Sequence, residues 1–194
     1  MGERVGVFGG TFDPVHVGHL AIARAAIETV PLDRVVFVVA RRSPLKDRSP
    51  LASEADRLTM LRAAVRGESA FAVSTLELDR PVPSYTVDTL EELARTGASL
   101  FLILGGDAFA DLARWHRAER VRELATILVA ARPGAPAPAG ARLLDAPLLD
   151  VSARELRARA ARGRSLRYLV PDTVWRYIEE RGLYRAGEPG PRTS

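Results

Sequence analysis

The sequence predicts an α/β protein with a doubly wound parallel sheet, helices on both faces and further helices at its C-terminus. Continuous apolar runs such as Arg34–Ala40 and Ser99–Leu104 are typical of strands that a parallel sheet buries on both faces. Segments in which apolar residues recur at helical spacing separate these runs. Because parallel strands need long crossover connections, which are usually helices, this alternation favours a parallel sheet.

The totals indicate one globular domain. For 194 residues we expect a single domain over 1–185 and a disordered tail over 186–194. Hydrophobic residues make up 47% of the chain and charged residues 27%, which is ordinary for a soluble protein. No apolar run is long enough to span a bilayer, so we expect no membrane partner. The lack of cysteine and of a signal-peptide pattern fits a cytoplasmic location.

The net charge of +4 favours anionic ligands. A nucleic-acid partner is not expected, because the arginines are scattered everywhere except between Arg154 and Arg167. The sequence leaves the oligomeric state open, and a homo-oligomer is one alternative.

Strand and helix patterns alternate through the first half of the chain. Apolar runs predict strands at Val5–Phe8, Arg34–Ala40 and Phe71–Ser74. Helical spacing predicts helices at 20–30, 53–65 and Thr86–Arg95, and Ser53 with Asp56 forms a capping box at the start of the second. Polar segments containing proline predict loops at Arg41–Pro50 and Arg80–Ser84.

The second half continues the alternation. Apolar runs predict strands at Ser99–Leu104, Thr126–Ala130 and Leu143–Leu144. Helical patterns follow at 109–124, Ser152–Arg162 and Pro171–Arg181, the last closed by Gly182. Arg132–Gly140 is rich in Pro, Gly and Ala and predicts a flexible loop.

The turn after the first strand carries the clearest chemical signal. It reads Gly9–Gly10–Thr11–Phe12–Asp13–Pro14–Val15–His16–Val17–Gly18–His19. The two leading glycines let a ligand approach the backbone closely. Both histidines can face one point beside a helix N-terminus, where free N–H groups and the helix dipole favour phosphate. There they can hold phosphate oxygens and neutralise charge that grows in a transition state.

Two other interpretations of the histidines stay open at this point. They could be metal ligands, or polar residues that merely begin a helix. A metal site would need further ligands, but the chain has no Cys and only one other histidine, His116.

This turn resembles the signature of the H-x-G-H nucleotidyltransferase superfamily. The chain up to about Tyr184 resembles one of its families, the bacterial nicotinate-nucleotide adenylyltransferases. The other matching segments are Pro44-x-Lys46, Ser84–Leu90, Gly105–Gly106–Asp107 with Trp115, Ser152-x-x-x-x-Arg157 and Val170–Tyr184. The resemblance implies a Rossmann-like fold and a reaction of NAD biosynthesis. In it, ATP and nicotinate mononucleotide (NaMN) give nicotinate adenine dinucleotide (NaAD) and pyrophosphate, with Mg²⁺ accompanying ATP.

The resemblance also implies an ATP site. His16, His19 and Lys46 would be catalytic, and Lys46 would follow the phosphate during transfer, although it could be an ordinary loop lysine. No general base is expected, because a phosphate monoester is already an anionic nucleophile. No metal-ligating side chain is named, because ATP would carry the Mg²⁺. The implied ATP-binding residues are Gly9, Gly10, Thr11, Phe12, His16, His19, Gly106, Asp107, Ser152 and Arg157.

A second set of residues would bind NaMN. The segment Ser84–Thr86 opens a helix, so its N–H groups can donate to the nicotinate carboxylate, or it can be a plain helix cap. Trp115 would stack on the pyridine ring, although an aromatic in a helical run is more often part of the core. The implied residues are Lys46, Ser84, Tyr85, Thr86, Trp115 and His116.

One segment departs from the family. Val151–Arg157 reads VSARELR where the family carries roughly I-S-[ST]-T-x-[IL]-R, so Ala153 and Arg154 replace hydroxyl residues. Ser152 and Glu155 also suffice for a capping box.

The alternatives to a nicotinate-nucleotide adenylyltransferase are a phosphopantetheine-type adenylyltransferase, a class I aminoacyl-tRNA synthetase, which needs a longer chain, and a catalytically silent nucleotide-binding module.

Overall fold

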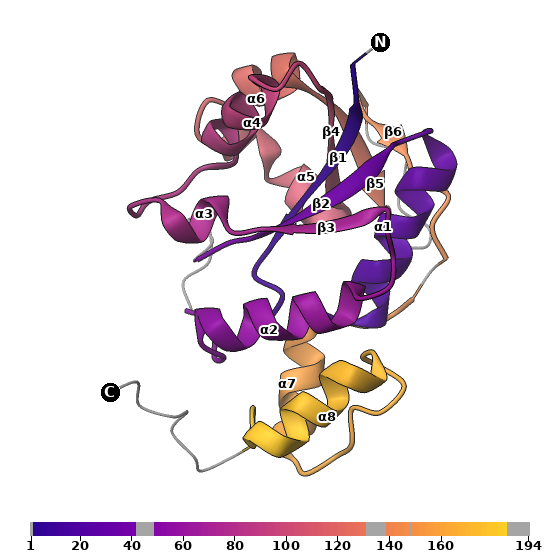
Figure 1. The fold of residues 1–194 in the computed structure, drawn as a ribbon, viewed down its shortest axis with the longest axis vertical. Helices are drawn as coiled ribbons and strands as arrows, with labels where there is room; N and C mark the ends of the chain where they lie inside the picture. Colours follow the sequence, from indigo (N-terminus) through magenta and orange to yellow (C-terminus); the bar gives the residue numbers. More distant parts are fainter. Residues whose placement is uncertain (1, 42–48, 131–138, 148, 186–194) are drawn as a thin grey trace.

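Six parallel strands form one sheet at the centre of the computed structural model, which describes residues 2–41, 49–130, 139–147 and 149–185 (Figure 1). The strand order is β3-β2-β1-β4-β5-β6. The order changes direction between β1 and β4, which confirms the predicted doubly wound arrangement. The strands are β1 (Arg4–Gly10), β2 (Arg34–Val39), β3 (Phe71–Ser74), β4 (Ser99–Gly105), β5 (Ala125–Ala130) and β6 (Arg142–Leu143).

Helices cover both faces of this sheet. One core cluster joins the sheet to α1 (Val17–Thr29), α2 (Glu54–Val65), α7 (Ala153–Ala161) and α8 (Asp172–Arg181). The other joins it to α4 (Thr86–Ala94), α5 (Gly106–Ala110), the 3₁₀ turn η1 (Leu112–Arg114) and α6 (Ala118–Leu124). The remaining short helix is α3 (Leu76–Asp79).

Side chains of the central strands alternate between these two cores. Phe8 pairs with Phe37 and belongs to the first core, whereas Val7 pairs with Val36 and belongs to the second. Because both faces are covered, β2 is buried over five successive residues. This explains why its sequence is a continuous apolar run rather than an alternating one.

Most predicted elements lie where the sequence placed them, with boundaries shifted by a few residues. Helix α3 was not predicted. Gly105 is the last residue of β4 and Gly106 the first residue of α5, so the strand passes directly into the helix. Three predicted segments lie wholly or largely outside the described residues: the loop that contains Lys46, the loop Arg132–Gly140 and the tail 186–194. The helices within the described ranges include none with the length and apolarity of a membrane span.

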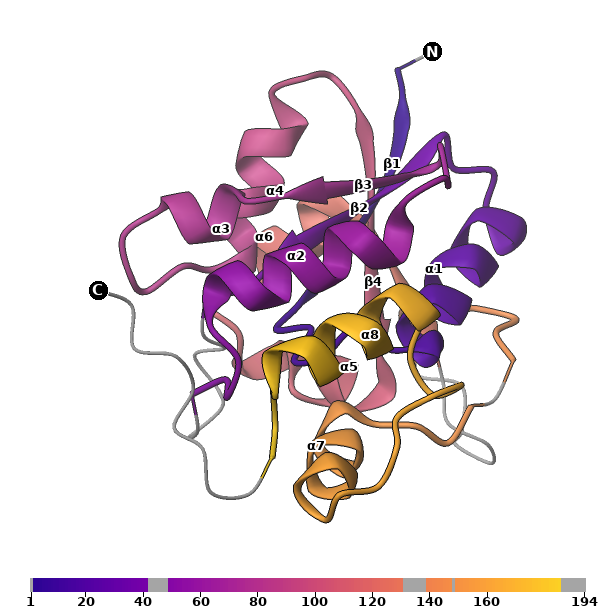
Figure 2. The ribbon, with the colours of Figure 1, turned by 60° about the horizontal axis from the view of Figure 1, so that its bottom comes forward.

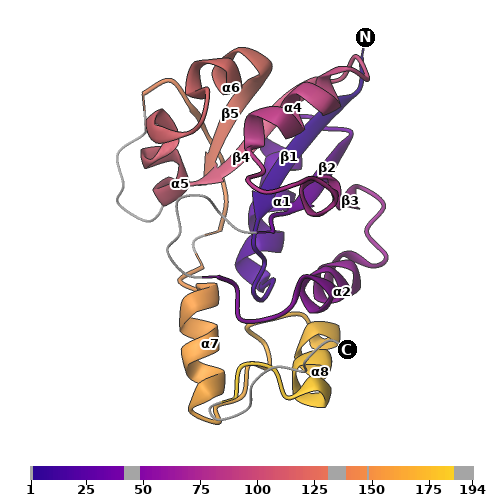
Figure 3. The ribbon, with the colours of Figure 1, turned by 90° about the vertical axis from the view of Figure 1, so that its left-hand side faces the viewer.

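The last two helices lie beyond the carboxyl ends of the strands. Figures 1 and 3 show α7 and α8 at the end of the molecule opposite the N-terminus. Helix α8 runs alongside α2, as Figure 2 shows. Crossover helices of a parallel sheet begin at its carboxyl edge, so α1, α2, α4 and α5 all present their N-termini there. The C-terminal helices therefore border the edge where this fold binds ligands.

Candidate active site

The turn between β1 and α1 is built around the side chain of Phe12. Its φ angle is 47°, its ring is 1% exposed, and that ring lies edge-on to the His19 ring at 5.1 Å. A Cβ at Gly10 would lie 3.0 Å from the Phe12 ring, whereas a Cβ at Gly9 would meet open space. Packing within the turn is therefore one reason for a glycine at position 10. The phenyl ring belongs to the core, and only the main chain of Phe12 is left to bind phosphate.

The two signature histidines stack on each other at the start of α1. Their ring centroids are 3.7 Å apart, with 30° between the planes. The main-chain N–H of His16 donates to Nδ1 of His19 at 3.2 Å. A neutral His19 therefore carries its proton on Nε2. The structure thus confirms that the i, i+3 spacing brings both imidazoles to one point at the helix start.

His16 is buried, and burial decides its charge. The residue is 7% exposed, and within the described part of the chain its Nδ1 has no hydrogen-bond partner. Desolvation lowers the pKa of His16 from 6.5 to about 4. The imidazole is therefore neutral at pH 7 in the ligand-free protein. That both histidines hold phosphate oxygens and neutralise their charge stays a prediction; in the ligand-free protein His16 is a neutral hydrogen-bonding group.

This burial predicts a pH-dependent stability. Between pH 6.5 and about 4 the unfolded chain binds a proton at His16 that the folded protein does not. The free energy of unfolding should therefore decrease as the pH is lowered through this interval, by at most roughly 1.4 kcal/mol per pH unit from this group. Urea denaturation at a series of pH values measures the slope. His16→Gln, which cannot titrate, should remove this part of it; an unchanged slope in the variant would contradict the prediction.

The lack of a side chain at Gly18 lets the segment before α7 approach the histidines. A Cβ at this position would lie 2.9 Å from Cγ1 of Val151 and 3.1 Å from Nδ1 of His16. Without a side chain there, Val151 packs against the turn, and α7 begins directly beyond it. Ser152 caps α7 by accepting a hydrogen bond from the Glu155 N–H at 3.2 Å, as predicted.

Arg157 lies one turn further along α7 and contacts the signature turn. Its Nη1 donates to the main-chain carbonyl of Asp13 at 2.6 Å. The predicted contact of Arg157 with ATP phosphates stays a prediction, but this contact shows a structural use for the same guanidinium. Arg154, the residue that breaks the family pattern, is exposed in the first turn of α7.

A buried guanidinium holds the ends of β1 and β2 together. Arg57 is 1% exposed, and its Nη1 donates to the carbonyls of Thr11 and Ala40, each at 2.7 Å. Its Nη2 donates to the carbonyl of Arg41 at 3.3 Å. Desolvation by burial lowers the pKa of Arg57, while the charges of the Asp13 and Glu54 carboxylates oppose that shift. The group therefore places a fixed positive charge beneath the signature turn.

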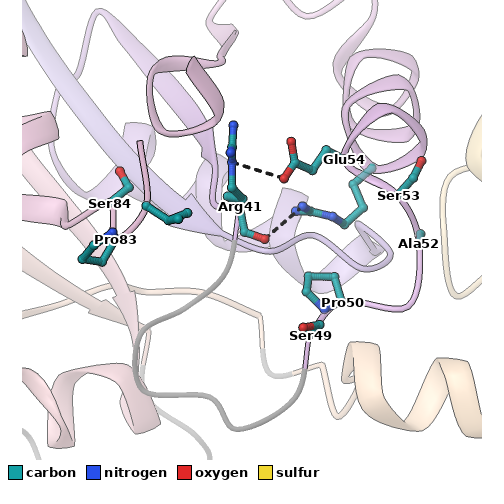
Figure 4. A pocket seen from close by; sticks show the side chains of 10 residues that line it. Arg41, Ser49, Pro50, Ala52, Ser53, Glu54, Pro83 and Ser84 are labelled. Atoms are coloured by element: carbon teal, nitrogen blue, oxygen red, sulfur yellow. Dashed lines mark hydrogen bonds and ion pairs between the residues drawn. The ribbon is translucent and has the colours of Figure 1, made fainter. Parts of the chain in front are cut away.

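A cavity of about 650 Å³ opens beside Arg57, between the start of α2 and the loop before α4 (Figure 4). Figure 4 shows Pro83 and Ser84 on one side of it and the ion pair of Arg41 with Glu54 on the other, at 3.2 Å. Ser84 is 9% exposed, and its Oγ is buried with no partner among the described residues. The residues that line the cavity are Arg41, Ser49, Pro50, Ala52, Ser53, Glu54, Arg57, Val82, Pro83 and Ser84.

Three of the remaining predicted NaMN residues, Tyr85, Thr86 and His116, lie at the start of α4. Thr86 is the first residue of this helix and Tyr85 its N-cap. The rings of Tyr85 and His116 are stacked, with centroids 4.3 Å apart. Trp115 is partly buried against the core between the sheet and α4, which supports the core role considered for it. Lys46 lies outside the described residues, in the segment between the cavity residues Arg41 and Ser49.

Gly106 and Asp107 begin α5 at the carboxyl end of β4, on the other side of the topological switch point from the signature turn. Asp107 is exposed. Over the part of the chain that the structure describes, no three His, Asp or Glu residues are grouped to hold a metal ion.

Comparison with known proteins identifies this arrangement. A family model described as cytidylyltransferase-like matches residues 7–159. The chain is 49% identical over 187 residues to a probable nicotinate-nucleotide adenylyltransferase of Thermus thermophilus, covering 94% of this chain and 100% of that one. The chain belongs to the nicotinate-nucleotide adenylyltransferase family. A protein with the same description from Roseiflexus castenholzii is 47% identical, and the alignment covers 94% of this chain and 98% of that one.

A solved adenylyltransferase has the same fold. It is the nicotinic acid mononucleotide adenylyltransferase of Plasmodium falciparum in complex with NaAD, which superposes with a TM-score of 0.78 at 16% identity. The alignment covers 94% of this chain and 97% of that one. The fold of the adenylyltransferase family thus spans the C-terminal helices as well as the sheet.

Sequence reasoning missed Arg57 in this adenylyltransferase fold, although a signal for it exists. Arg57 stands four residues before Leu61, so both lie on the core-facing side of α2. A charged residue at a core position indicates a buried polar contact. The sequence could not name the three partners, which lie 46, 17 and 16 residues earlier in the chain.

Proposed function

We propose that the protein transfers the adenylyl group of ATP to NaMN, giving NaAD and pyrophosphate. The observation that carries this proposal is the stacked histidine pair at the N-terminus of α1, beside the switch point of the sheet. A helix N-terminus with imidazole donors suits the phosphates of ATP. Relatives that share nearly the whole chain and are described as nicotinate-nucleotide adenylyltransferases support the choice of reaction.

The reaction needs positioning and charge stabilisation rather than a base. A phosphate oxygen of NaMN forms a bond to the α-phosphorus of ATP. The bond from that phosphorus to the bridging oxygen breaks, and its electron pair leaves with pyrophosphate. We assign His19 Nε2 and the main-chain N–H groups of residues 10–12 to the phosphate oxygens. Lys46 is assigned to the transferring phosphate, as the only lysine of the chain.

The acceptor would lie beside Ser84. The cavity between Ser84 and Arg41 is large enough for part of a mononucleotide, and its buried Ser84 hydroxyl offers a hydrogen bond. The N-terminus of α4 at Tyr85–Thr86 would receive the nicotinate carboxylate. His116, stacked on Tyr85, would border the same position.

The metal would come with the nucleotide. Mg²⁺ commonly binds through substrate phosphates and one or two carboxylates, and it would neutralise charge on the leaving pyrophosphate. Asp107 is the carboxylate we assign to a ribose hydroxyl or to the ordering of this ion, because it stands at the carboxyl end of β4. Ser152, with the N-terminus of α7, and Arg157 are assigned to the β- and γ-phosphates.

The acid mononucleotide should be preferred over the amide. A carboxylate gains more from the positive end of α4 than a carboxamide does. We therefore expect a higher kcat/KM for NaMN than for nicotinamide mononucleotide, measured as pyrophosphate release from ATP and Mg²⁺ under identical conditions. No pyrophosphate release with either acceptor would refute the proposed reaction. Equal efficiency would refute only the role of the Ser84–Thr86 segment.

A further inference from the structure

Asp13 is the most heavily used acceptor in the signature turn. It is 2% exposed, and its carboxylate accepts hydrogen bonds from the main-chain N–H groups of Leu51 at 2.8 Å and Ala52 at 3.1 Å. The hydroxyl of Tyr184 donates to Oδ1 at 2.8 Å. Arg157 donates to its main-chain carbonyl and stands 3.6 Å from its Oδ2. The carboxylate is thus directed into the protein.

These donors come from separate parts of the fold. Leu51 and Ala52 precede α2, Arg157 belongs to α7, and Tyr184 follows α8. Asp13 therefore joins the C-terminal helices to the turn that carries His16, three residues further on. Buried carboxylate bonds of this kind are strong and geometrically demanding, because leaving one partner unpaired costs its full desolvation.

The backbone before and at Tyr184 is shaped to deliver its hydroxyl. Gly182 ends α8 in the left-handed conformation, and Leu183 is buried in the first core. Tyr184 itself has a φ of 67°, which is rare for a bulky residue. An unfavourable backbone conformation persists only where the surrounding contacts hold it. Here the contact is the hydrogen bond to Asp13, 171 residues away in sequence.

We propose that Tyr184 is a positioning residue for adenylyl transfer: through Asp13 it sets the place of the signature turn, and hence of the stacked histidines. This inference rests on the proposed function. Transfer chemistry depends on the placement of phosphate-binding groups, and a displacement of about 1 Å can cost on the order of a hundredfold in rate. The hydroxyl itself never meets the substrate, because its partner is the buried Asp13 carboxylate.

The chain contains a matched control on the same C-terminal unit. Tyr177, in α8, donates its hydroxyl to Oδ1 of Asp56 at 2.8 Å, the same bond length as that from Tyr184 to Asp13. Asp56 lies in the first turn of α2 and also accepts from Ser53 and Arg181. Tyr→Phe at either position removes one hydroxyl and its hydrogen bond to a buried carboxylate. Only Tyr184→Phe releases the signature turn.

The test compares Tyr184→Phe with Tyr177→Phe in the full chain, at a temperature well below both melting transitions. We expect Tyr184→Phe to lower kcat by about tenfold, with the KM for ATP changed by less than about twofold. Tyr177→Phe should lower the melting temperature by a similar amount yet keep kcat within about twofold of the parent. An equal kcat in the two variants would show that Tyr184 acts on stability alone and would overturn the inference.

A second readout separates this inference from the proposed function. The imidazole resonances of His16 and His19, followed by NMR in the ligand-free protein, should shift in Tyr184→Phe and stay in place in Tyr177→Phe. If the parent protein makes no NaAD while these resonances shift as expected, the proposed reaction is refuted, and the positioning of the signature turn by Tyr184 is still supported. If the parent makes NaAD and the resonances are identical in both variants, the positioning role fails alone.

Discussion

His19→Ala is expected to lower kcat by a hundredfold or more, while the affinity for ATP falls less. Nδ1 of His19 already accepts the N–H of His16, so Nε2 is the atom that can donate to a phosphate oxygen. A preorganised donor that meets charge developing in the transition state contributes on the order of a hundredfold or more to kcat. Steady-state kinetics with ATP varied at saturating NaMN separates kcat from KM.

The variant His19→Asn separates the role of Nε2 from that of Nδ1. The Asn amide stands where Nδ1 stands, so its oxygen can keep the contact with the His16 N–H. It provides nothing at the position of Nε2. We therefore expect His19→Asn to lose nearly as much activity as His19→Ala while melting closer to the parent protein. Near-normal turnover in His19→Asn would show that His19 only completes the turn and does not act on the phosphate.

His16→Ala is expected to lower kcat as well, but through a different physical effect. The His16 ring is neutral and buried, and it supports the His19 ring at 3.7 Å. Its removal leaves a space beside Gly18 and Val151, so both stability and catalysis should fall. A loss of melting temperature without loss of kcat would assign His16 to packing alone.

Arg57→Met should produce the largest loss of stability of any substitution considered for this protein. Methionine fills most of the volume, but the carbonyls of Thr11, Ala40 and Arg41 lose their donor in a buried position. At about 1–3 kcal/mol for each unsatisfied buried group, the free energy of unfolding should drop by roughly 3 kcal/mol or more. Urea denaturation at pH 7 measures this difference.

Arg62→Met is the control for that measurement. Arg62 lies on the same helix but is exposed, so the same change of residue type removes no buried contact. Its effect should stay within about 0.5 kcal/mol of the parent. A comparable loss in the two variants would mean that Arg57 contributes through its charge or helix propensity rather than through the three carbonyls.

Local patterns in the sequence were sufficient for the fold class and the reaction family. The run at Arg34–Ala40, the capping pair Ser53 and Asp56, and the glycine at 182 each depend on neighbouring residues alone. Burial on both faces, helix capping and left-handed termination are local requirements, so the residues that meet them can be recognised without a structure. The eleven-residue signature turn is local in the same sense.

Tertiary structure decided what the signature residues do. The sequence places His16 and His19 together, but it does not show that packing buries His16 and lowers its pKa to about 4. It presents Phe12 as a phosphate-binding position, but it does not show that the ring of Phe12 packs in the core and leaves the main chain for that role. Burial and pKa depend on which distant elements cover a residue, and the spacing of residues along the chain does not show which elements these are.

What the sequence determined by itself is the parallel sheet, the order of its elements and the histidine turn at its carboxyl edge. Only the tertiary structure joined that turn to Arg57, 46 residues later, and to Tyr184, 171 residues after Asp13. Periodicity and capping are set by the backbone geometry of one segment. The hydrogen bonds that hold the turn depend on how α2, α7 and α8 pack against the sheet, because donor and acceptor meet only when the first core has formed.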